Sequence, residues 1–350
     1  MIKVGLVGCG RISKKHSEIL GNNLVKGITL TAVCDIIEEK AKILGKKYKV
    51  VHYTCMHEMI KNNEIDLIVV LTESGNHAKH VIELAQYGKD IIVEKPMALT
   101  IDDADSMIEA CQQNNCKLFV VKQNRFNNAV VELKDLLLNK KLGEIFLGTI
   151  RVRWSRDQKY YDQDSWRGTW KMDGGVLTNQ ASHHIDLLEW LIGPVDSVFA
   201  KSKTALVDIE TEDTAVVILN FKNGALGVIE ATTATRPKDL EGSVSVLGSK
   251  GTIVIGGFAV NKIETWNIVG QEQQNLDHLN ENPKDVYGFG HIKYYNHVVD
   301  VLNGDAKILV DGFQGRKSIE IINAIYESIE TEKEVFIRFK PNKCKLGDRL

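Results

Sequence analysis

The chain has 350 residues, more than one small hydrophobic core usually serves, so its length predicts two domains. Hydrophobic residues make up 43% of the sequence and charged residues 26%, as in ordinary water-soluble globular proteins. The formal net charge of −2 gives no electrostatic reason to expect binding to nucleic acid or to an acidic membrane surface. The sequence shows neither a signal peptide nor an apolar run of membrane-spanning length, so we expect a cytoplasmic protein.

The first 35 residues have the order strand, glycine turn, helix, strand, acid, which is typical of a dinucleotide-binding βαβ unit. Strands are predicted at 2–7 and 29–34. Between them, Gly8 permits a tight turn and Gly10 lets the backbone approach a pyrophosphate at a helix N-terminus. Asp35 ends the second strand, where its carboxylate can accept hydrogen bonds from both hydroxyls of an adenosine ribose. This favours NAD over NADP, whose 2′-phosphate Asp35 would repel.

Ser13 stands where the third glycine of the fingerprint is usual. That position mainly serves close packing of helix on strand, so a small serine weakens the match without refuting it. The alternative is a glycine-rich turn in some other α/β protein.

The remainder of the first domain alternates strands and helices. Apolar runs of this kind indicate a parallel sheet that is covered on both faces. Strands are predicted at 66–71, 90–94 and 117–121, with helices at 78–87 and from residue 100 onward.

After Asn124 the pattern changes to alternating apolar and polar runs separated by hairpin turns, which indicates a mainly antiparallel sheet. Strands are predicted at 145–154, 195–205, 214–221, 226–233, 243–247 and 252–255, and helices at 128–139, 177–192, 289–303 and 314–331. The fold class is therefore α/β, with a doubly wound parallel domain over 1–122 and an α+β domain with a large open sheet over 123–350. The basic tail 340–350 is expected to be mobile or arm-like.

The six cysteines form no C-x-x-C pair and no zinc-site spacing. We therefore expect free thiols in a reducing compartment and no bound metal.

Glu94-Lys95-Pro96 follows a predicted parallel strand. Ligands of open α/β sheets gather at the carboxyl ends of the strands, so Lys95 is expected to face the ligand crevice. Pro96 makes the preceding residue extended, which fixes the direction of Lys95. The alternative is a surface lysine before a turn.

A second polar group follows Gly174-Gly175. On the predicted helix 177–192, Asn179, His183 and Asp186 are spaced i, i+4 and i+7, so they share one face. A neutral imidazole at His183 can accept a proton near pH 7. The alternative is structural: Asp186 orients His183 or forms a surface salt bridge.

Together these features resemble the Gfo/Idh/MocA family, which includes glucose–fructose oxidoreductase and inositol dehydrogenase. The resemblance covers nearly the whole chain. It rests on Gly8-Cys9-Gly10, Glu94-Lys95-Pro96, Asn124-Arg125, the glycine-led helix with His183-x-x-Asp186, Asp311-Gly312-Phe313-Gln314-Gly315-Arg316-Lys317 and Ala324-Ile325-Tyr326-Glu327-Ser328.

The resemblance implies that Lys95 and His183 are catalytic and that the cofactor is NAD. Many members have Asp four positions before the histidine, where this chain has Asn179. Asn179 cannot be a general base and is expected to position the substrate by hydrogen bonding. Whether His183 or a Lys95 of lowered pKa is the base stays open. The implied cofactor-binding residues are Gly8, Gly10, Arg11, Ile12, Asp35, Thr72, His77, Glu94, Lys95 and Gln123.

Three segments further resemble a bacterial sugar-nucleotide branch of the family that oxidises C3 of UDP-N-acetyl-glucosaminuronic acid (UDP-GlcNAcA) for surface polysaccharide. These segments are 71–77, 122–127 and 166–175, the last followed by Asn179-Gln180. Arg153, Arg156, Arg167 and Lys171 are candidates to meet a carboxylate or a pyrophosphate. The implied substrate-binding residues are Trp166, Arg167, Thr169, Asn179, Gln180 and Asp186.

Three alternatives remain. One is an inositol or simple-sugar dehydrogenase of the same family. Another is a glycosidase that uses bound NAD in a transient oxidation, and the third is a non-catalytic binder, which the retention of Lys95 and His183 disfavours. Because an open sheet face needs covering, we also expect a homodimer or homotetramer.

Overall fold

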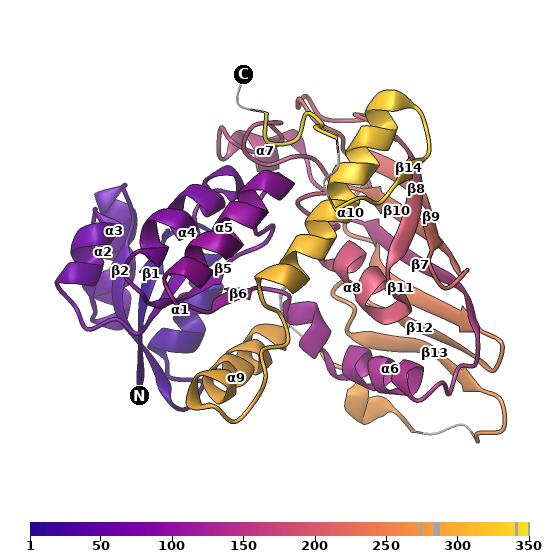
Figure 1. Cartoon of the computed structure of the whole chain (residues 1–350), viewed down its shortest axis with the longest axis horizontal. Coiled ribbons are helices and arrows are strands. Elements are labelled where there is room, and N and C mark those ends of the chain that lie inside the picture. The colour runs from indigo at the N-terminus through magenta and orange to yellow at the C-terminus, as the bar shows by residue number, and fades with distance from the viewer. Residues whose placement is uncertain (273–274, 283–287, 340–341, 349–350) are drawn as a thin grey trace. The chain divides into compact units, whose positions relative to one another are not determined.

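The computed structural model describes residues 1–272, 275–282, 288–339 and 342–348 (Figure 1). The chain divides into two compact units. The first contains residues 1–98, 102–121 and 291–316, and the second contains 99–101, 122–290 and 317–350. The predicted boundary after residue 122 adjoins the observed division after Val121. Residues 291–316, however, were expected in the second domain and pack with the first unit.

The first unit is built on a six-stranded sheet in the order β3-β2-β1-β4-β5-β6, with every pair parallel. Its strands are β1 (Ile2–Val7), β2 (Ile28–Cys34), β3 (Val51–Tyr53), β4 (Leu67–Val70), β5 (Asp90–Val93) and β6 (Leu118–Val120). All four residues of β4 are buried, as a strand covered on both faces requires. The doubly wound parallel domain is thus confirmed, with its strand order reversing beside β1.

The helices of the first unit include two, α2 and α3, that the sequence patterns did not indicate. They are α1 (Ser13–Gly21), α2 (Glu38–Tyr48), α3 (Met56–Lys61), α4 (His77–Ala85), α5 (Ile101–Gln113) and α9 (Gly290–Asn303). After α9 the chain joins the sheet, because the Val120 amide donates to the Val310 carbonyl oxygen at 3.1 Å. This long-range pairing places 291–316 in the first unit, and no local pattern reveals it.

The second unit contains an eight-stranded sheet in the order β13-β12-β11-β7-β10-β9-β8-β14. Only β7 and β10 are parallel, so the predicted mainly antiparallel sheet is confirmed. Its strands are β7 (Ile145–Arg153), β8 (Val195–Lys203), β9 (Thr214–Phe221), β10 (Leu226–Thr232), β11 (Glu241–Gly248), β12 (Gly251–Gly256), β13 (Lys262–Ile268) and β14 (Val335–Phe336). The sequence patterns did not indicate β13 or β14.

Helices cover one face of this sheet (Figure 1). They are α6 (Asn128–Leu138), α8 (Ser182–Ile192) and the part of α10 (Gly312–Thr331) that belongs to the second unit; a short α7 (Gln158–Asp162) lies in a connecting segment. Short 3-10 helices are η1 (Ser74–Asn76), η2 (Gln123–Phe126) and η3 (Asp277–Leu279). Across the described residues, every helix is too short or too polar to traverse a lipid bilayer.

The glycine-led helix begins later than expected. Residues 175–181 form turns, and α8 starts at Ser182 rather than at residue 177. The cause is Glu212: its carbonyl oxygen accepts from Val176 N, and its side chain accepts from Leu177 N at 3.0 Å. A Cβ at Gly175 would lie 2.3 Å from Cδ of Glu212, so glycine is required at this close approach. Asn179 therefore precedes α8.

The C-terminal segment also differs from the expectation of a mobile tail. Within 342–348, Leu346 is buried, and the Gly347 amide donates to the Trp170 carbonyl oxygen at 2.8 Å. Residues 340–341 and 349–350 lie outside the described residues. The described part of the tail thus packs on the second unit.

Glu212 is a buried carboxyl group that supports the turn before α8. Its Oε1 accepts hydrogen bonds from Leu177 N and from the Tyr326 hydroxyl, each at 3.0 Å. Its Oε2 is buried without a hydrogen-bond partner among the described residues. Burial raises the pKa of Glu212 to about 7, against hydrogen bonds that lower it. A proton on Oε2 is therefore favoured up to neutral pH.

We predict that Glu212→Gln removes a pH dependence of stability. The pKa of Glu212 is about 7 in the folded protein against 4.5 for an ordinary glutamate, so the folded state holds an extra proton between these values. Wild-type stability then falls as the pH rises through this window, by roughly 3 kcal/mol, whereas the variant lacks the loss. Denaturant unfolding at pH 5 and pH 8 measures both; an equal change in the two proteins contradicts the assignment.

Candidate active site

The glycine turn after β1 leaves space for a bound group. Gly8 has φ +100°, and a Cβ there would lie 2.7 Å from the Leu71 backbone, so the turn requires glycine. A Cβ at Gly10 would meet no atom within 4 Å, so the backbone there is open to a ligand. No side chain caps the N-terminus of α1, whose dipole favours an anion. Ser13 is fully buried, as the packing role predicted for it requires.

Asp35 is oriented by two backbone amides. Cys9 N donates to Oδ2 and Ile37 N donates to Oδ1, each at 2.8 Å. The half-buried carboxylate therefore lies beside the glycine turn, at the end of β2. The open backbone at Gly10 and the fixed carboxylate at Asp35 fit the pyrophosphate and the ribose diol of NAD.

His77 joins two turns at the carboxyl ends of the strands. It is buried, and its ring nitrogens lie 2.7 Å from the Pro96 carbonyl oxygen and 3.0 Å from that of Thr72. Burial lowers the pKa of His77. Because both ring nitrogens face carbonyl oxygens of the protein, His77 holds the turns after β4 and β5 together. A cofactor contact of His77 stays a prediction; Thr72 itself is half-buried.

Glu94 is likewise enclosed. Its side chain is buried, Oε2 accepts from Lys95 N at 2.7 Å, and Oε1 lies 3.0 Å from Nε2 of His16. Both oxygens thus have partners within the protein, and a cofactor contact of Glu94 stays a prediction. Lys95 is half-buried at the end of β5, as expected for a residue at the carboxyl ends of the strands. Arg11 is exposed and Ile12 half-buried at the start of α1.

In the second unit, the structure places Gln123 against His183. His183 is half-buried on α8, and its Nε2 lies 3.1 Å from Nε2 of Gln123, which belongs to η2. The amide can donate to an unprotonated ring nitrogen, and with the amide turned over it can accept from a protonated one. Gln123 was expected among the cofactor ligands. In the structure its amide can form a hydrogen bond with either protonation state of His183.

Asp186 forms a buried ion-pair cluster. Nε and Nη2 of Arg125 donate to its two oxygens, each at 2.8 Å, and Nζ of Lys122 lies 3.6 Å from Oδ1. All three side chains are at most 2% exposed. Burial raises the pKa of Asp186, but the charges of Arg125 and Lys122 outweigh it and lower this pKa. Both oxygens of Asp186 are thus paired inside the protein, and a substrate contact of Asp186 stays a prediction.

Asp173 joins the turn after the Trp166-Arg167-Gly168-Thr169-Trp170 motif to Asn179. Its Oδ1 accepts from Nδ2 of Asn179 at 2.5 Å, and its Oδ2 accepts from Gly168 N at 2.9 Å. Within the motif, the Thr169 hydroxyl donates to the Trp166 carbonyl oxygen at 2.7 Å. Asp173 thus brings most of the predicted substrate-binding residues together.

Arg167 lies between aromatic rings. Its guanidinium carbon is 4.6 Å from the ring centre of Trp166 and 4.9 Å from that of Tyr160. It donates to the Tyr160 hydroxyl and to Asp164, each at 3.0 Å, and Nε2 of Gln180 lies 3.5 Å from the same hydroxyl. This aromatic and cationic cluster suits a ligand that has flat rings and negative charge.

Sequence reasoning missed several of the residues that support the site. Asp173 lies inside the segment 166–175 that carries part of the family resemblance, so its position indicated a role. Tyr160, whose ring contacts Arg167, was not among the predicted site residues. Lys122 and Arg125 lie in the segment 122–127 that carries part of the family resemblance, but no pattern of nearby residues connects them to Asp186.

The family comparisons cover both units. Residues 2–122 match the family described as "Oxidoreductase family, NAD-binding Rossmann fold". Residues 134–337 match "Oxidoreductase family, C-terminal alpha/beta domain". These two matches span most of the chain.

Individual relatives differ in what their names say they act on. The WlbA dehydrogenase from Bordetella pertussis, solved in complex with NADH and UDP-GlcNAcA, is 38% identical with a TM-score of 0.89, over 96% of this chain and 99% of that one. Myo-inositol 2-dehydrogenase of Thermotoga maritima is 30% identical over 95% of this chain and 98% of its own length. Glucose-6-phosphate 3-dehydrogenase of Bacillus subtilis is 25% identical over 92% and 95%. The chain belongs to the Gfo/Idh/MocA family and is an NAD-dependent oxidoreductase.

Proposed function

We propose that this enzyme oxidises the C3 hydroxyl of UDP-GlcNAcA with NAD, in the synthesis of a sugar for bacterial surface polysaccharide. The observation that carries the proposal is the Asp173-linked group, which ties the Trp166–Trp170 motif to Asn179. The likeness to a WlbA dehydrogenase that holds NADH and UDP-GlcNAcA supports it.

In this mechanism His183 takes the proton of the sugar hydroxyl while the carbon of that hydroxyl loses a hydride. Gln123 contacts the same ring at Nε2 and orients it. The ammonium of Lys95 stabilises the oxygen as negative charge develops on it. Bound NAD supplies the hydride acceptor, so the products are a ketone, NADH and one proton.

A nucleotide sugar needs flat surfaces and partners for negative charge. Arg167 lies over Trp166 and Tyr160, and the guanidinium of Arg156 lies 5.4 Å from the ring centres of Trp154 and Tyr160. We assign this cluster to the uronate carboxylate or the diphosphate. The proposed substrate-binding residues are Trp166, Arg167, Thr169, Asn179 and Gln180.

The second candidate is a free-polyol dehydrogenase, which the 30% identity to a myo-inositol 2-dehydrogenase favours. The two candidates differ in the charge of the substrate. A free polyol gives the two guanidiniums near Tyr160 no anion to bind, whereas a UDP-linked uronate gives them several.

We also propose that the outer face of the second unit's sheet binds a second copy of the chain. Adjacent strands there expose apolar side chains: Phe199 is 37% exposed, Val216 50%, Ile218 52% and Leu226 51%. A row of exposed apolar residues on a sheet is typical of a subunit interface.

We also propose a cytoplasmic location. The free thiols of the six cysteines support a reducing compartment.

The first prediction from this proposal concerns the substrate. UDP-GlcNAcA is expected to reduce NAD, followed by absorbance of the nicotinamide band, whereas myo-inositol and glucose are not. Assays with UDP-N-acetyl-glucosamine, which lacks the carboxylate, test the anion contact. The opposite ranking assigns the enzyme to the free-polyol branch, and sugar release without net NADH assigns it to the glycosidases.

The second prediction concerns the two catalytic residues. Lys95→Met and His183→Asn are each expected to lower kcat by about a hundredfold to ten-thousandfold, as loss of an acid–base group does. Both variants are expected to fold and to bind NADH, measured by fluorescence titration. Near-normal turnover in either variant removes that residue from the mechanism.

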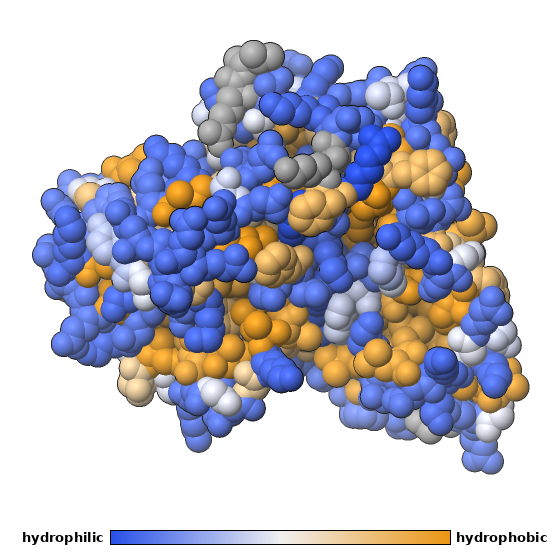
Figure 2. Space-filling view, in the orientation of Figure 1, coloured by the Kyte–Doolittle hydropathy of each residue, from blue (hydrophilic) through white to orange (hydrophobic). Residues whose placement is uncertain are grey.

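The third prediction concerns self-association. Val216→Asp on β9 is expected to shift the sedimentation mass towards that of the monomer, because it places a charge in the apolar face. Val131→Asp on α6 is the matched control, since both valines are 50% exposed. Figure 2 shows hydrophobic residues around α6 as well, so the control tests whether any exposed apolar site suffices. An unchanged mass for Val216→Asp, or equal shifts in both, contradicts an interface on the sheet.

A further inference from the structure

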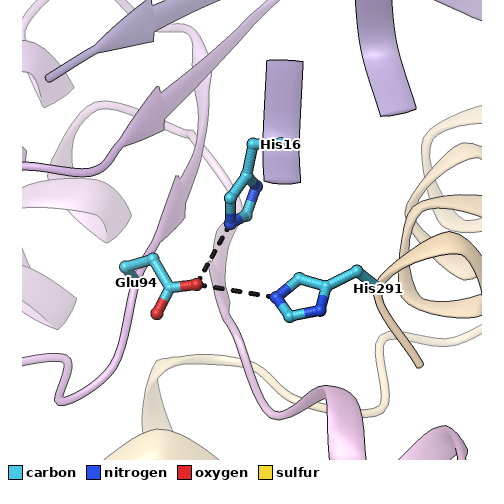
Figure 3. Close-up of side chains that lie close together, drawn as sticks. All are labelled: His16, Glu94 and His291. Carbon is cyan, nitrogen blue, oxygen red and sulfur yellow. Dashed lines mark hydrogen bonds and ion pairs between the residues drawn. The ribbon is translucent and has the colours of Figure 1, made fainter. Parts of the chain in front are cut away.

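Three ionisable side chains from distant parts of the sequence meet inside the first unit (Figure 3). His16 comes from α1, Glu94 follows β5, and His291 comes from α9. Nε2 of His16 lies 3.0 Å and Nε2 of His291 lies 3.8 Å from the same oxygen, Oε1 of Glu94. All three side chains are at most 6% exposed.

The protons of this cluster can be assigned from its partners. Burial lowers the pKa of His16, against the hydrogen bond to Glu94, so the imidazole is neutral and has one N–H. Its Nδ1 lies 2.7 Å from the Tyr295 hydroxyl, and burial raises the pKa of Tyr295 well above its usual range. The phenol therefore keeps its proton. Because Nε2 of His16 faces the carboxylate of Glu94, which can only accept, the ring proton lies on Nε2, and Nδ1 accepts the hydrogen bond of the phenol.

Glu94 is thereby held as a carboxylate. Burial raises the pKa of Glu94, but the hydrogen bond from His16 and the nearby imidazole of His291 outweigh it and hold this pKa well below the usual range. The other oxygen, Oε2, accepts from the backbone N–H of Lys95 at 2.7 Å. The same carboxylate thus binds two histidines and the peptide group of Lys95.

We propose that His16, His291 and Glu94 are positioning residues that fix the backbone of Lys95. The inference rests on the catalytic role proposed for Lys95. An ammonium that stabilises developing charge acts best when its place is set before the reaction, and small displacements lower the rate. Hydrogen bonds run from Tyr295 on α9 to His16 on α1, then to Glu94 and on to Lys95 N. This chain holds the backbone of Lys95 in place.

A metal ion is the competing interpretation, because two imidazoles and a carboxylate also form metal sites. A metal at Nε2 of His16 would require that nitrogen to be unprotonated and the proton to lie on Nδ1. The Tyr295 hydroxyl could accept from Nδ1 in that case, so elemental analysis of the purified enzyme decides between the two interpretations. The hydrogen-bonded arrangement accounts for the contacts of His16 without an ion.

The first test measures amide hydrogen exchange at Lys95 by mass spectrometry and requires no substrate. Compared with wild type, His16→Leu is expected to speed exchange of this amide by roughly ten- to hundredfold, because Glu94 loses a donor and moves. His16→Gln is expected to restore protection, since its amide nitrogen can replace Nε2. Ile19→Val, a buried change on the same helix, controls for loss of stability alone.

The second test measures NAD reduction with UDP-GlcNAcA. His16→Leu is expected to lower kcat by roughly ten- to hundredfold with KM changed less than about threefold. His16→Gln is expected to recover most of kcat, and Ile19→Val to lower only the melting temperature. If wild type does not oxidise UDP-GlcNAcA, the proposed substrate fails, while the exchange experiment still tests the positioning network.

Three outcomes overturn the proposal. One is equal exchange at Lys95 and equal kcat in His16→Leu and wild type. Another is a stoichiometric metal in the purified wild-type enzyme, by elemental analysis, that is lost in His16→Leu. A fall in kcat that Ile19→Val reproduces at the same loss of stability also rejects a positioning role.

Discussion

The arrangement of the second unit's site depends on the buried pairing of Asp186 with Arg125. Each oxygen of the carboxylate accepts a guanidinium hydrogen bond of 2.8 Å, and both side chains are at most 2% exposed. A buried charge that loses its partner costs several kcal/mol, so η2 and α8 cannot separate without a large penalty. Gln123 lies two residues before Arg125, and His183 three before Asp186. The ion pair therefore sets the contact between the amide and the catalytic imidazole.

Sequence patterns predicted the elements whose formation depends on residues close together in the chain. The order strand, glycine turn, helix and Asp35 is contained in 35 residues, and the structure has those elements in that order. Alternating apolar and polar residues likewise predicted six of the eight strands that the structure describes in the open sheet. The pattern failed at residues 177–181, because a helical spacing of Asn179 and His183 does not show that Glu212 binds the intervening backbone. A buried carboxyl 35 residues away overrode the local preference.

Contacts over long sequence distances could not be predicted from one sequence. His16 and Glu94 are 78 residues apart, and His16 and Tyr295 are 279 apart, so no spacing signals their contact. Glu94 was singled out only because it precedes Lys95. For the same reason the packing of residues 291–316 with the first unit was not predicted: the pairing of this segment with β6 depends on backbone hydrogen bonds that side-chain patterns do not report.

Each unit contains a buried carboxylate, Glu94 in the first and Asp186 in the second, that holds the segment with the proposed catalytic residue. Because an unpaired buried charge is costly, substitutions at either carboxylate affect stability and catalysis together. The cluster around Arg167 and Tyr160 is less constrained, since it depends on ring contacts and on a partly exposed ion pair with Asp164. Relatives with different substrates can therefore share the buried carboxylates and differ in this cluster.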